Sequence, residues 1–156
     1  MMKTAANHNW KIVSEIDLIY KTKVKSSQRP HISSSRCAYS LLKDCWEPGK
    51  MELLEEFKVL LMSQANQVLG LYEASSGGMT GTVVDIRFLF AAALKARAVG
   101  IIIAHNHPSG GMVPSEPDRL ITRKIAQAGM LLDIRLLDHL ILTTESYYSF
   151  ADEGAL

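Results

Sequence analysis

The chain contains little cysteine, no long hydrophobic run and almost no net charge. Among its 156 residues the only cysteines are Cys37 and Cys45, and their spacing is not that of a C-x-x-C metal or redox motif. This spacing predicts free thiols in a reducing cytosol. The longest apolar stretches, such as "AVGIIIA", are far too short to cross a bilayer, and "MMKTAANHNWKIVSE" lacks the apolar segment of a secretory signal. We therefore expect a cytoplasmic protein that does not enter a membrane.

Charge and hydropathy are those of an ordinary folded domain. The 17 Lys and Arg residues nearly balance the 16 Asp and Glu residues, which gives a net charge of +1. The chain therefore lacks the overall electrostatic signature of a nucleic-acid-binding protein, although a local basic patch remains compatible with this balance. Hydrophobic residues make up 47% of the chain and charged residues 21%. We predict a single domain over residues 1–156 with no internal boundary.

Apolar residues follow strand-like and helix-like spacings in turn along the chain. Strands are predicted at 12–24, 55–62, 68–75 and 101–104, and as two further segments within 131–144. The stretch "SQANQ" predicts a hairpin turn, and "ESYYSFADEGAL" a short tail. Because helices and strands interleave, we expect an α/β or α+β domain with a mixed sheet.

Two of the three predicted helices start at serines that can cap a helix. One follows the serines at 33–35 and ends at the "EPGK" break, residues 47–50. The other opens at Ser115 and closes at Gly129.

The remaining predicted helix lies between these two. A capping box of Thr82 and Asp85 begins it, and it runs through about Ala98 before Gly100 ends it. Asp85 and Arg87 are expected to supply a helix cap and a salt bridge, without a catalytic role.

The stretch "AHNHPSGGMVPSEPD" carries candidate metal ligands. His105 and His107 lie at the end of a predicted strand, where residues i and i+2 point to one face about 6.5–7 Å apart. The following proline stops the strand, and glycines in the loop allow Asp118 to return alongside. Three protein ligands leave a fourth position for water, as in catalytic zinc sites, although these donors also accept iron or manganese. Alternatively, each histidine is an ordinary hydrogen-bonded side chain and Asp118 only completes a capping box with Ser115.

The same stretch resembles the H-x-H-P-x6-S-x-x-D core of the JAMM (MPN-plus, JAB-type) metallopeptidases. The blocks "EEFKVLLMSQANQVLG", "SSGGMTGTVVDIRFLFAAALKARAVGIIIAHNHPSG" and "LLDIRLLDHLILTTESYYSFADEG" are similar to the RadC-like branch of that family over roughly residues 52–154. Residues 1–51 match less clearly and look like a lead-in without the helix-hairpin-helix segment of full-length RadC proteins. The resemblance implies a deaminase-like α/β/α sandwich that holds one zinc ion per chain.

The resemblance also implies a role for each residue of the motif. His105, His107 and Asp118 match the zinc ligands, and Ser115 matches the serine whose hydroxyl helps stabilise a developing oxyanion. The implied reaction is hydrolysis of an amide or isopeptide bond in a peptide or protein substrate by zinc-activated water.

A glutamate upstream of the ligands completes the implied machinery as the general base. Glu55 and Glu56 both precede Phe57, and the family pattern selects Glu55. Because adjacent strand residues face opposite ways, only one of the two can reach the water. Without the motif, a solvated charge at a strand entrance would be the simpler interpretation of Glu55.

Three further polar residues have two interpretations each. Asp138 and His139 either orient a metal ligand or form a satisfied pair in the core, and the structural role is favoured. Asn106 either positions the loop of the active site or is an ordinary loop asparagine.

Two other function classes remain open. A nucleic-acid-associated module would use a basic surface, for which Lys21, Lys23 and Lys25 are the best candidates. A non-catalytic scaffold would have the same fold without bound metal. His8 and His31 lie in polar surroundings and are expected to be exposed.

Overall fold

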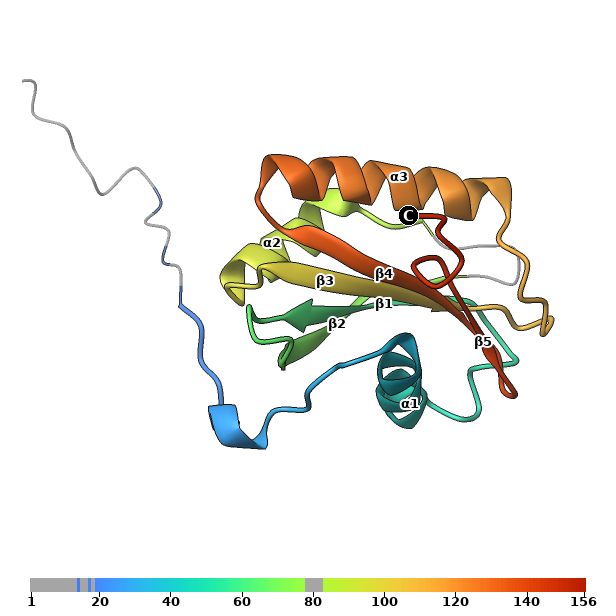
Figure 1. Ribbon diagram of the computed structural model, residues 1–156, viewed down its shortest axis with the longest axis horizontal. Helices are drawn as coiled ribbons and strands as arrows, with labels where there is room; N and C mark the ends of the chain where they lie inside the picture. The colour runs from blue at the N-terminus through green and yellow to red at the C-terminus, as the bar shows by residue number, and fades with distance from the viewer. Residues whose placement is uncertain (1–13, 15–16, 18, 78–82) are drawn as a thin grey trace, which may run out of the picture.

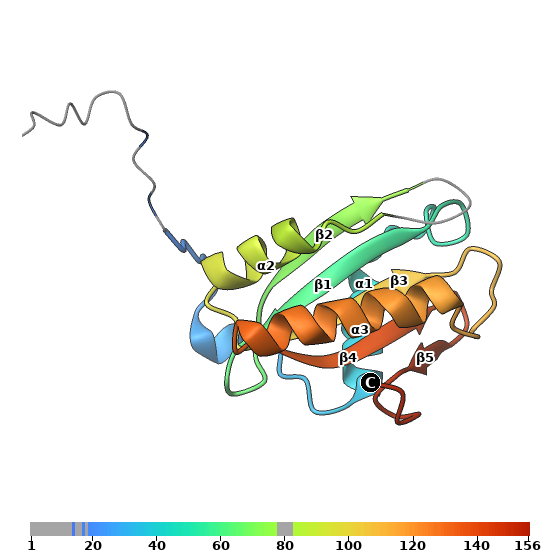
Figure 2. The same ribbon diagram turned by 90° about the horizontal axis from the view of Figure 1, so that it is seen from above.

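A computed structural model describes residues 14, 17, 19–77 and 83–156 and shows a sheet between two layers of helices (Figure 1). The elements are η2 (Ser26–Gln28), α1 (Ser35–Cys45), β1 (Glu56–Met62), β2 (Val68–Ser76), α2 (Ile86–Lys95), β3 (Gly100–Asn106), α3 (Glu116–Leu131), β4 (Arg135–Leu142) and β5 (Tyr147–Ser149). Helix α1 covers one face of the sheet, and α2 and α3 cover the other, where α3 lies along β4 (Figure 2). The predicted α/β/α sandwich is confirmed.

The five strands form one mixed sheet in the order β2-β1-β3-β4-β5. Strands β3 and β4 are parallel and are joined by α3, whereas the other neighbouring pairs are antiparallel. Strands β1 and β3 are buried along their whole length, which explains the apolar runs 59–62 and 101–104 within them. The carboxyl end of β3 therefore meets the first turn of α3 at one edge of the sandwich, where loops can form a site.

Alternate side chains of the inner strands enter two separate cores. One core lies under α2 and α3, and its fully buried strand residues include Val59, Ile101 and Ile103. The other lies against α1 and includes Leu60 and Met62. This alternation fixes the register, because a shift of one residue would exchange the two faces.

The predicted strand at 12–24 is wrong for the part that the structure describes. Residues 14, 17 and 19–24 lie in no strand. Tyr20 packs against the core under α2 and α3, and its hydroxyl donates to the backbone oxygen of Leu69 at 3.2 Å. An alternating pattern shows that a segment suits a sheet surface, but strand formation also requires backbone partners.

The first helix agrees with its prediction. Ser34 caps α1 by accepting a hydrogen bond from the backbone N–H of Cys37, and α1 ends at Cys45 before the "EPGK" break. Both cysteines are free, as predicted, and both are exposed.

Helix α2 is shorter than predicted at its carboxyl end. It ends at Lys95 rather than near Ala98, because Arg97 adopts the left-handed conformation with φ 58°. Gly100 does not end the helix but is the first residue of β3. At the amino end Asp85 is the cap and forms the predicted salt bridge to Arg87 at 2.7 Å.

Further predictions about the ends of elements are wrong or fall on residues that the structure does not describe. Thr82, the other half of the predicted capping box, lies outside the described residues. Gly129 does not close α3 but lies inside it, where an added Cβ would collide with the backbone oxygen of Ile134. The segment 131–144 forms one strand, β4, rather than two, and the predicted tail supplies β5 and the fully buried Phe150.

None of the helices in the described ranges combines the length and apolar character that a membrane crossing needs.

Candidate metal centre

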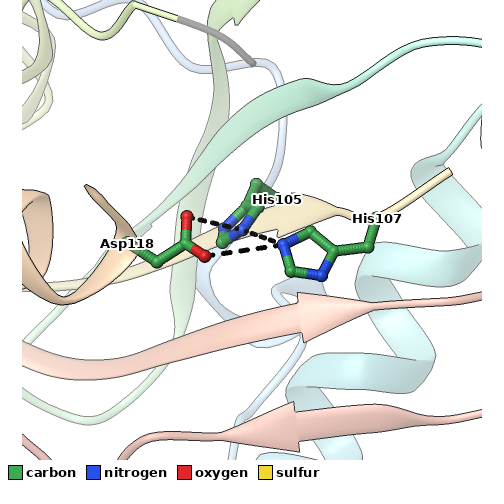
Figure 3. A group of neighbouring side chains, drawn as sticks. All are labelled: His105, His107 and Asp118. Carbon is green, nitrogen blue, oxygen red and sulfur yellow. Dashed lines mark hydrogen bonds and ion pairs between the residues drawn. The ribbon is translucent and has the colours of Figure 1, made fainter. Parts of the chain in front are cut away.

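The three predicted ligands come together at the carboxyl end of β3. His105 is the penultimate residue of that strand, His107 follows the strand, and Asp118 lies in the first turn of α3. Figure 3 shows the three side chains pointing toward one another. The Nε2 atoms of the two histidines are 3.0 Å apart, and Asp118 lies 3.2 Å from His105 Nε2 through Oδ1 and 3.6 Å from His107 Nε2 through Oδ2. The predicted convergence of two imidazoles and a distant carboxylate is confirmed.

These separations suit a single small cation. Zinc bonds of about 2.0–2.1 Å in tetrahedral geometry place neighbouring ligand atoms about 3.3–3.4 Å apart. The three observed separations of 3.0, 3.2 and 3.6 Å lie on both sides of that value. Two nitrogens and one carboxylate oxygen are also a donor set that zinc accepts. His105, His107 and Asp118 could therefore hold a metal ion.

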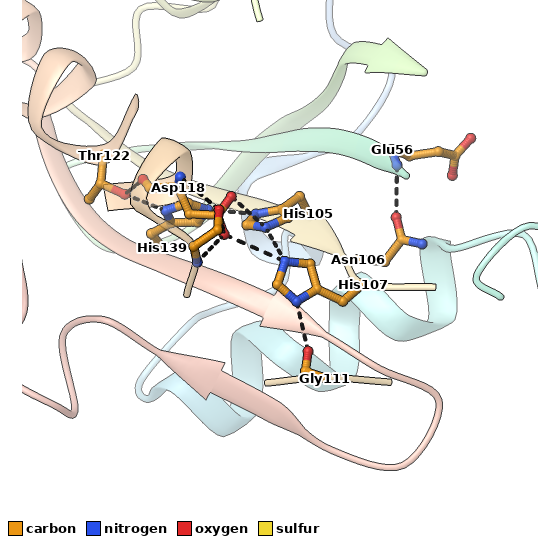
Figure 4. Close-up of polar contacts among 9 residues, drawn as sticks. Glu56, His105, Asn106, His107, Gly111, Asp118, Thr122 and His139 are labelled. Atoms are coloured by element: carbon orange, nitrogen blue, oxygen red, sulfur yellow. Dashed lines mark hydrogen bonds and ion pairs between the residues drawn. The ribbon is translucent and has the colours of Figure 1, made fainter. Parts of the chain in front are cut away.

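A chain of hydrogen bonds fixes the tautomer of His105 (Figure 4). The Thr122 hydroxyl donates to the backbone oxygen of Asp118 at 2.6 Å. Its oxygen then accepts from Nδ1 of His139 at 2.6 Å, so Nε2 of His139 carries a lone pair. That lone pair accepts from Nδ1 of His105 at 2.8 Å. The lone pair of His105 Nε2 therefore points at the candidate metal position.

His107 is oriented by a separate contact. Its Nδ1 donates to the backbone oxygen of Gly111 at 2.7 Å, which leaves the lone pair on Nε2. Two imidazole lone pairs 3.0 Å apart, with a carboxylate beside them, repel one another unless a cation or proton lies between them. A cation at this position would relieve that repulsion, and the three side chains could hold one.

The ionisation of the neighbouring groups agrees with such a site. Burial opposes ionisation of Asp118, but the hydrogen bonds that His105 and His107 donate to it in their protonated forms outweigh burial and hold the pKa of this carboxyl far below its usual range. When His107 is protonated, its Nε2–H donates to the Asp118 carboxylate, and this hydrogen bond raises the pKa of His107 above the usual 6.5, against the effect of burial. Burial, together with the nearby charge of His105, lowers the pKa of His139 well below that value. His139 is therefore neutral at pH 7 and able to accept the proton of His105.

Asp118 both caps α3 and faces the histidines. Its Oδ2 accepts from the backbone N–H of Ser115 at 2.7 Å and from the Ser115 hydroxyl at 2.6 Å, while Ser115 Oγ accepts from the Asp118 N–H at 3.2 Å. Asp118 therefore completes the predicted capping box with Ser115 and also faces the two histidines as a candidate ligand. The single proton of the Ser115 hydroxyl is directed at Asp118 in this structure.

A cleft of about 600 Å³ opens over the candidate metal position, and all five predicted site residues line it. They are Glu55, His105, His107, Ser115 and Asp118.

The two candidate glutamates face opposite sides of the sheet. Glu55 lines the cleft, and its charge contributes to the raised pKa of His107. Glu56 is buried on the α1 side, 3.5 Å from Nζ of Lys58 and 4.0 Å from Nζ of Lys50. The structure therefore places Glu55 on the metal side.

The pair at 138–139 divides between the two faces of β4. His139 contacts the ligand His105 directly, so it is the orienting residue of the pair. Asp138 instead accepts hydrogen bonds from Ser149 Oγ and from the backbone N–H groups of His139 and Ala151. Asp138 thus has the structural role, and His139 does not.

Sequence reasoning missed Thr122 altogether. Thr122 lies four residues after Asp118 on α3, and residues at that spacing share a helix face. That spacing is the signal that could have found it.

The other predicted residues lie away from the cleft or outside the described residues. Lys21, Lys23 and Lys25 are exposed and do not line it. His31 is exposed as predicted, and His8 lies outside the described residues.

An α/β/α sandwich with two histidines and an aspartate at the end of a central strand defines the class of domains that carry a JAB-type candidate metal centre. The chain belongs to the family of the RadC-like JAB domain, whose model matches residues 32–155. The match includes α1, so it begins earlier than the resemblance seen in the sequence.

Curated relatives carry names that state no activity. A UPF0758 protein of Flavobacterium johnsoniae is 46% identical over 124 residues, which cover 79% of this chain and 52% of the relative. A UPF0758 protein of Porphyromonas gingivalis is 40% identical over 131 residues, 83% of this chain and 56% of the relative. The UPF0758 protein YfjY of Escherichia coli is 42% identical over 113 residues, 71% of each chain. The chain spans about half the length of the first two relatives.

Proposed function

We propose that the protein is a zinc-dependent hydrolase of the metallopeptidase type, acting on an amide or isopeptide bond. The observation that carries this proposal is the convergence of His105 Nε2, His107 Nε2 and the Asp118 carboxylate in an open cleft that also contains Glu55. Three protein ligands leave a coordination position for water, as catalytic rather than structural zinc sites do. A zinc ion held there would polarise a carbonyl and supply a water with a pKa near 7.

Glu55 and Ser115 have different roles in this reaction: Glu55 transfers protons, and Ser115 stabilises developing negative charge. Glu55, on the cleft side of the β1 entrance, takes a proton from the attacking water and returns it to the leaving amine. Ser115 stabilises the oxyanion when its hydroxyl turns from Asp118 toward the cleft. Removing one such donor typically costs about 2.7–4 kcal/mol of barrier.

Metal content tests the ligand assignment first. Mass spectrometry of protein purified without a histidine tag should find about one zinc per chain, which also decides between zinc, iron and manganese. His107→Ala removes one of three ligands and should strip this metal. Stoichiometric zinc in that variant would overturn the assignment.

Turnover of a fluorogenic peptide library tests the activity. Glu55→Gln removes the base and should lower the cleavage rate by about 10²–10⁴-fold while zinc stays bound, because Glu55 is not one of the three ligands. Glu56→Gln is the matched control, since Glu56 is adjacent and faces the other side. Equal loss in both variants would refute the role of Glu55, and absence of both bound zinc and turnover would favour the non-catalytic scaffold.

The nucleic-acid module remains a separate prediction and concerns a different surface. Filter binding across salt concentrations decides it, because phosphate contacts through Lys21, Lys23 and Lys25 would make affinity fall with salt. Absence of salt-sensitive binding would leave these lysines as solvated side chains.

A further inference from the structure

Asn106 is a fully buried side chain that lies between the two histidine ligands and points away from the metal position. Its Oδ1 accepts a hydrogen bond from the backbone N–H of Glu56 at 2.8 Å (Figure 4). Its Nδ2 donates to the backbone oxygens of Met51 at 2.7 Å and Leu54 at 2.9 Å. Both amide protons and the amide oxygen are thus used, and all three contacts are to the segment that leads into β1.

These contacts continue the sheet where its backbone ladder ends. The last pair between β1 and β3 is Phe57 with His105. One residue further on, the N–H of Glu56 bonds to the side chain of Asn106 instead of to β3 backbone. A primary amide can accept one hydrogen bond and donate two in this way, which neither an aliphatic nor a hydroxyl side chain can do.

The peptide groups held by Asn106 lie on both sides of Glu55. The Leu54 oxygen is immediately before it and the Glu56 N–H immediately after it, so fixing both restricts the backbone torsions of Glu55. On the opposite face the Glu56 side chain lies 3.5 Å from buried Lys58 Nζ, which keeps Glu56 away from the cleft. One side chain therefore connects the strand that carries the ligands to the residue proposed as the base.

We propose that Asn106 is a positioning residue that sets the distance and direction of the Glu55 carboxylate relative to the metal. This inference rests on the proposed hydrolase function. A misplacement of about 1 Å can cost about a hundredfold in rate, so the position of the base must be fixed by a rigid contact. Asn106 supplies that contact because it is fully buried and lies in the same strand as His105.

The test compares zinc-loaded parent chain with Asn106→Ala. Ser149→Ala is the matched control, because Ser149 is also buried and its hydrogen bonds to Asp138 and Asp152, which the substitution removes, lie away from the cleft. We expect Asn106→Ala to keep about one zinc and a KM within about twofold, while kcat on the fluorogenic peptides falls about ten- to hundredfold. Ser149→Ala should keep the parent kcat.

A double-mutant cycle separates positioning from general loss of structure. If Asn106 acts through Glu55, adding Asn106→Ala to Glu55→Gln should change the residual rate by less than about twofold. An equal fall in both backgrounds, or a fall no larger than that of Ser149→Ala, would overturn the inference.

Hydrogen exchange measures the same contact without turnover. Asn106→Ala should accelerate amide exchange of residues 51–56 at least about tenfold, with little change in α3 or β4. Unchanged protection there would overturn the inference even if the enzyme is active. Absence of turnover in the parent chain would instead refute the proposed function, and with it any catalytic role of Asn106. Should Asn106→Ala not fold, Asn106→Asp, whose carboxylate keeps the acceptor for Glu56 N–H but cannot donate to Met51 and Leu54, undergoes the same measurements.

Discussion

Replacing His139 with phenylalanine tests whether the buried hydrogen-bond chain orients the ligand His105. The ring of His139 stacks on Phe150 with centroids 4.6 Å apart and planes at 9°. Phenylalanine keeps this packing but removes the 2.8 Å contact to His105 Nδ1 and the 2.6 Å contact to Thr122. The Nδ1 proton of His105 then has no acceptor, and the opposite tautomer, with its proton on the metal-facing Nε2, becomes competitive.

The size of the effect follows from the hydrogen bond that the substitution removes from His105. Removing the partner that orients a metal-bound histidine typically weakens metal affinity by about 10–100-fold, which is about 1.4–2.7 kcal/mol. At a fixed zinc concentration above the Kd, the stabilisation by zinc falls by the same amount. For a chain of this length, about 1 kcal/mol corresponds to about 2–4 °C. The rise in Tm on adding zinc should therefore be about 3–10 °C smaller than in the parent.

The assay is competition for zinc against a chromophoric chelator, together with melting curves with and without zinc. Comparing the zinc-induced change within each variant removes the effect of the substitution on the metal-free protein. Thr122→Val, which breaks the chain one step further from the ligand, should weaken zinc less than His139→Phe does. Parent affinity in His139→Phe would refute the reasoning that His139 fixes the tautomer of His105.

Two further predictions concern pH and packing. The pKa of His107 is raised above 6.5, and this ring must lose its proton to bind metal, so zinc affinity should fall about tenfold per pH unit below that pKa. Competition for zinc against a chelator from about pH 5.5 to 8 measures this pH dependence. The Asp118 carboxyl, whose pKa is lowered, stays ionised over that pH range and adds nothing to the slope. An affinity that does not change with pH would contradict the prediction. Gly129→Ala places a Cβ against the backbone oxygen of Ile134 and should lower stability by about 1–3 kcal/mol, measured as a lower Tm of the metal-free protein. An unchanged Tm would contradict this prediction and would mean that the backbone after α3 moves to accommodate the added Cβ at little energetic cost.

The sequence predicts the parts of the fold that are determined locally. Strands β1 and β3 contain the apolar runs 59–62 and 101–104, and the serine caps at the start of α1 and α3 lie where the sequence indicates. The alternation at 12–24 is equally strand-like, yet its described part pairs with no strand. Pairing depends on which backbone edges are free in the folded sheet, and that is a property of distant segments. For the same reason β5 and the burial of Phe150 were not foreseen in the predicted tail.

Some residues of the candidate site can be predicted from local sequence, whereas others depend on distant segments of the chain. His105 and His107 are close because a strand places residues i and i+2 on one face, and Glu55 differs from Glu56 by the same alternation. The partners Thr122 and His139 come from α3 and β4, and nothing in their immediate sequence places them against a ligand. Their roles follow from the parallel β3–α3–β4 arrangement, which brings the three elements to one edge.

The capping role of Asp118 explains why the third candidate ligand lies at the start of a helix. A carboxylate offers about four acceptor sites, and the capping box uses Oδ2 for the backbone and hydroxyl of Ser115. The same contacts hold the carboxyl group so that Oδ1 lies 3.2 Å from His105 Nε2. The capping contacts thereby restrict rotation of the Asp118 side chain before metal binds. Less conformational entropy is then lost on binding than with a freely rotating carboxylate. The capping motif and the metal motif share their residues because one geometry satisfies both.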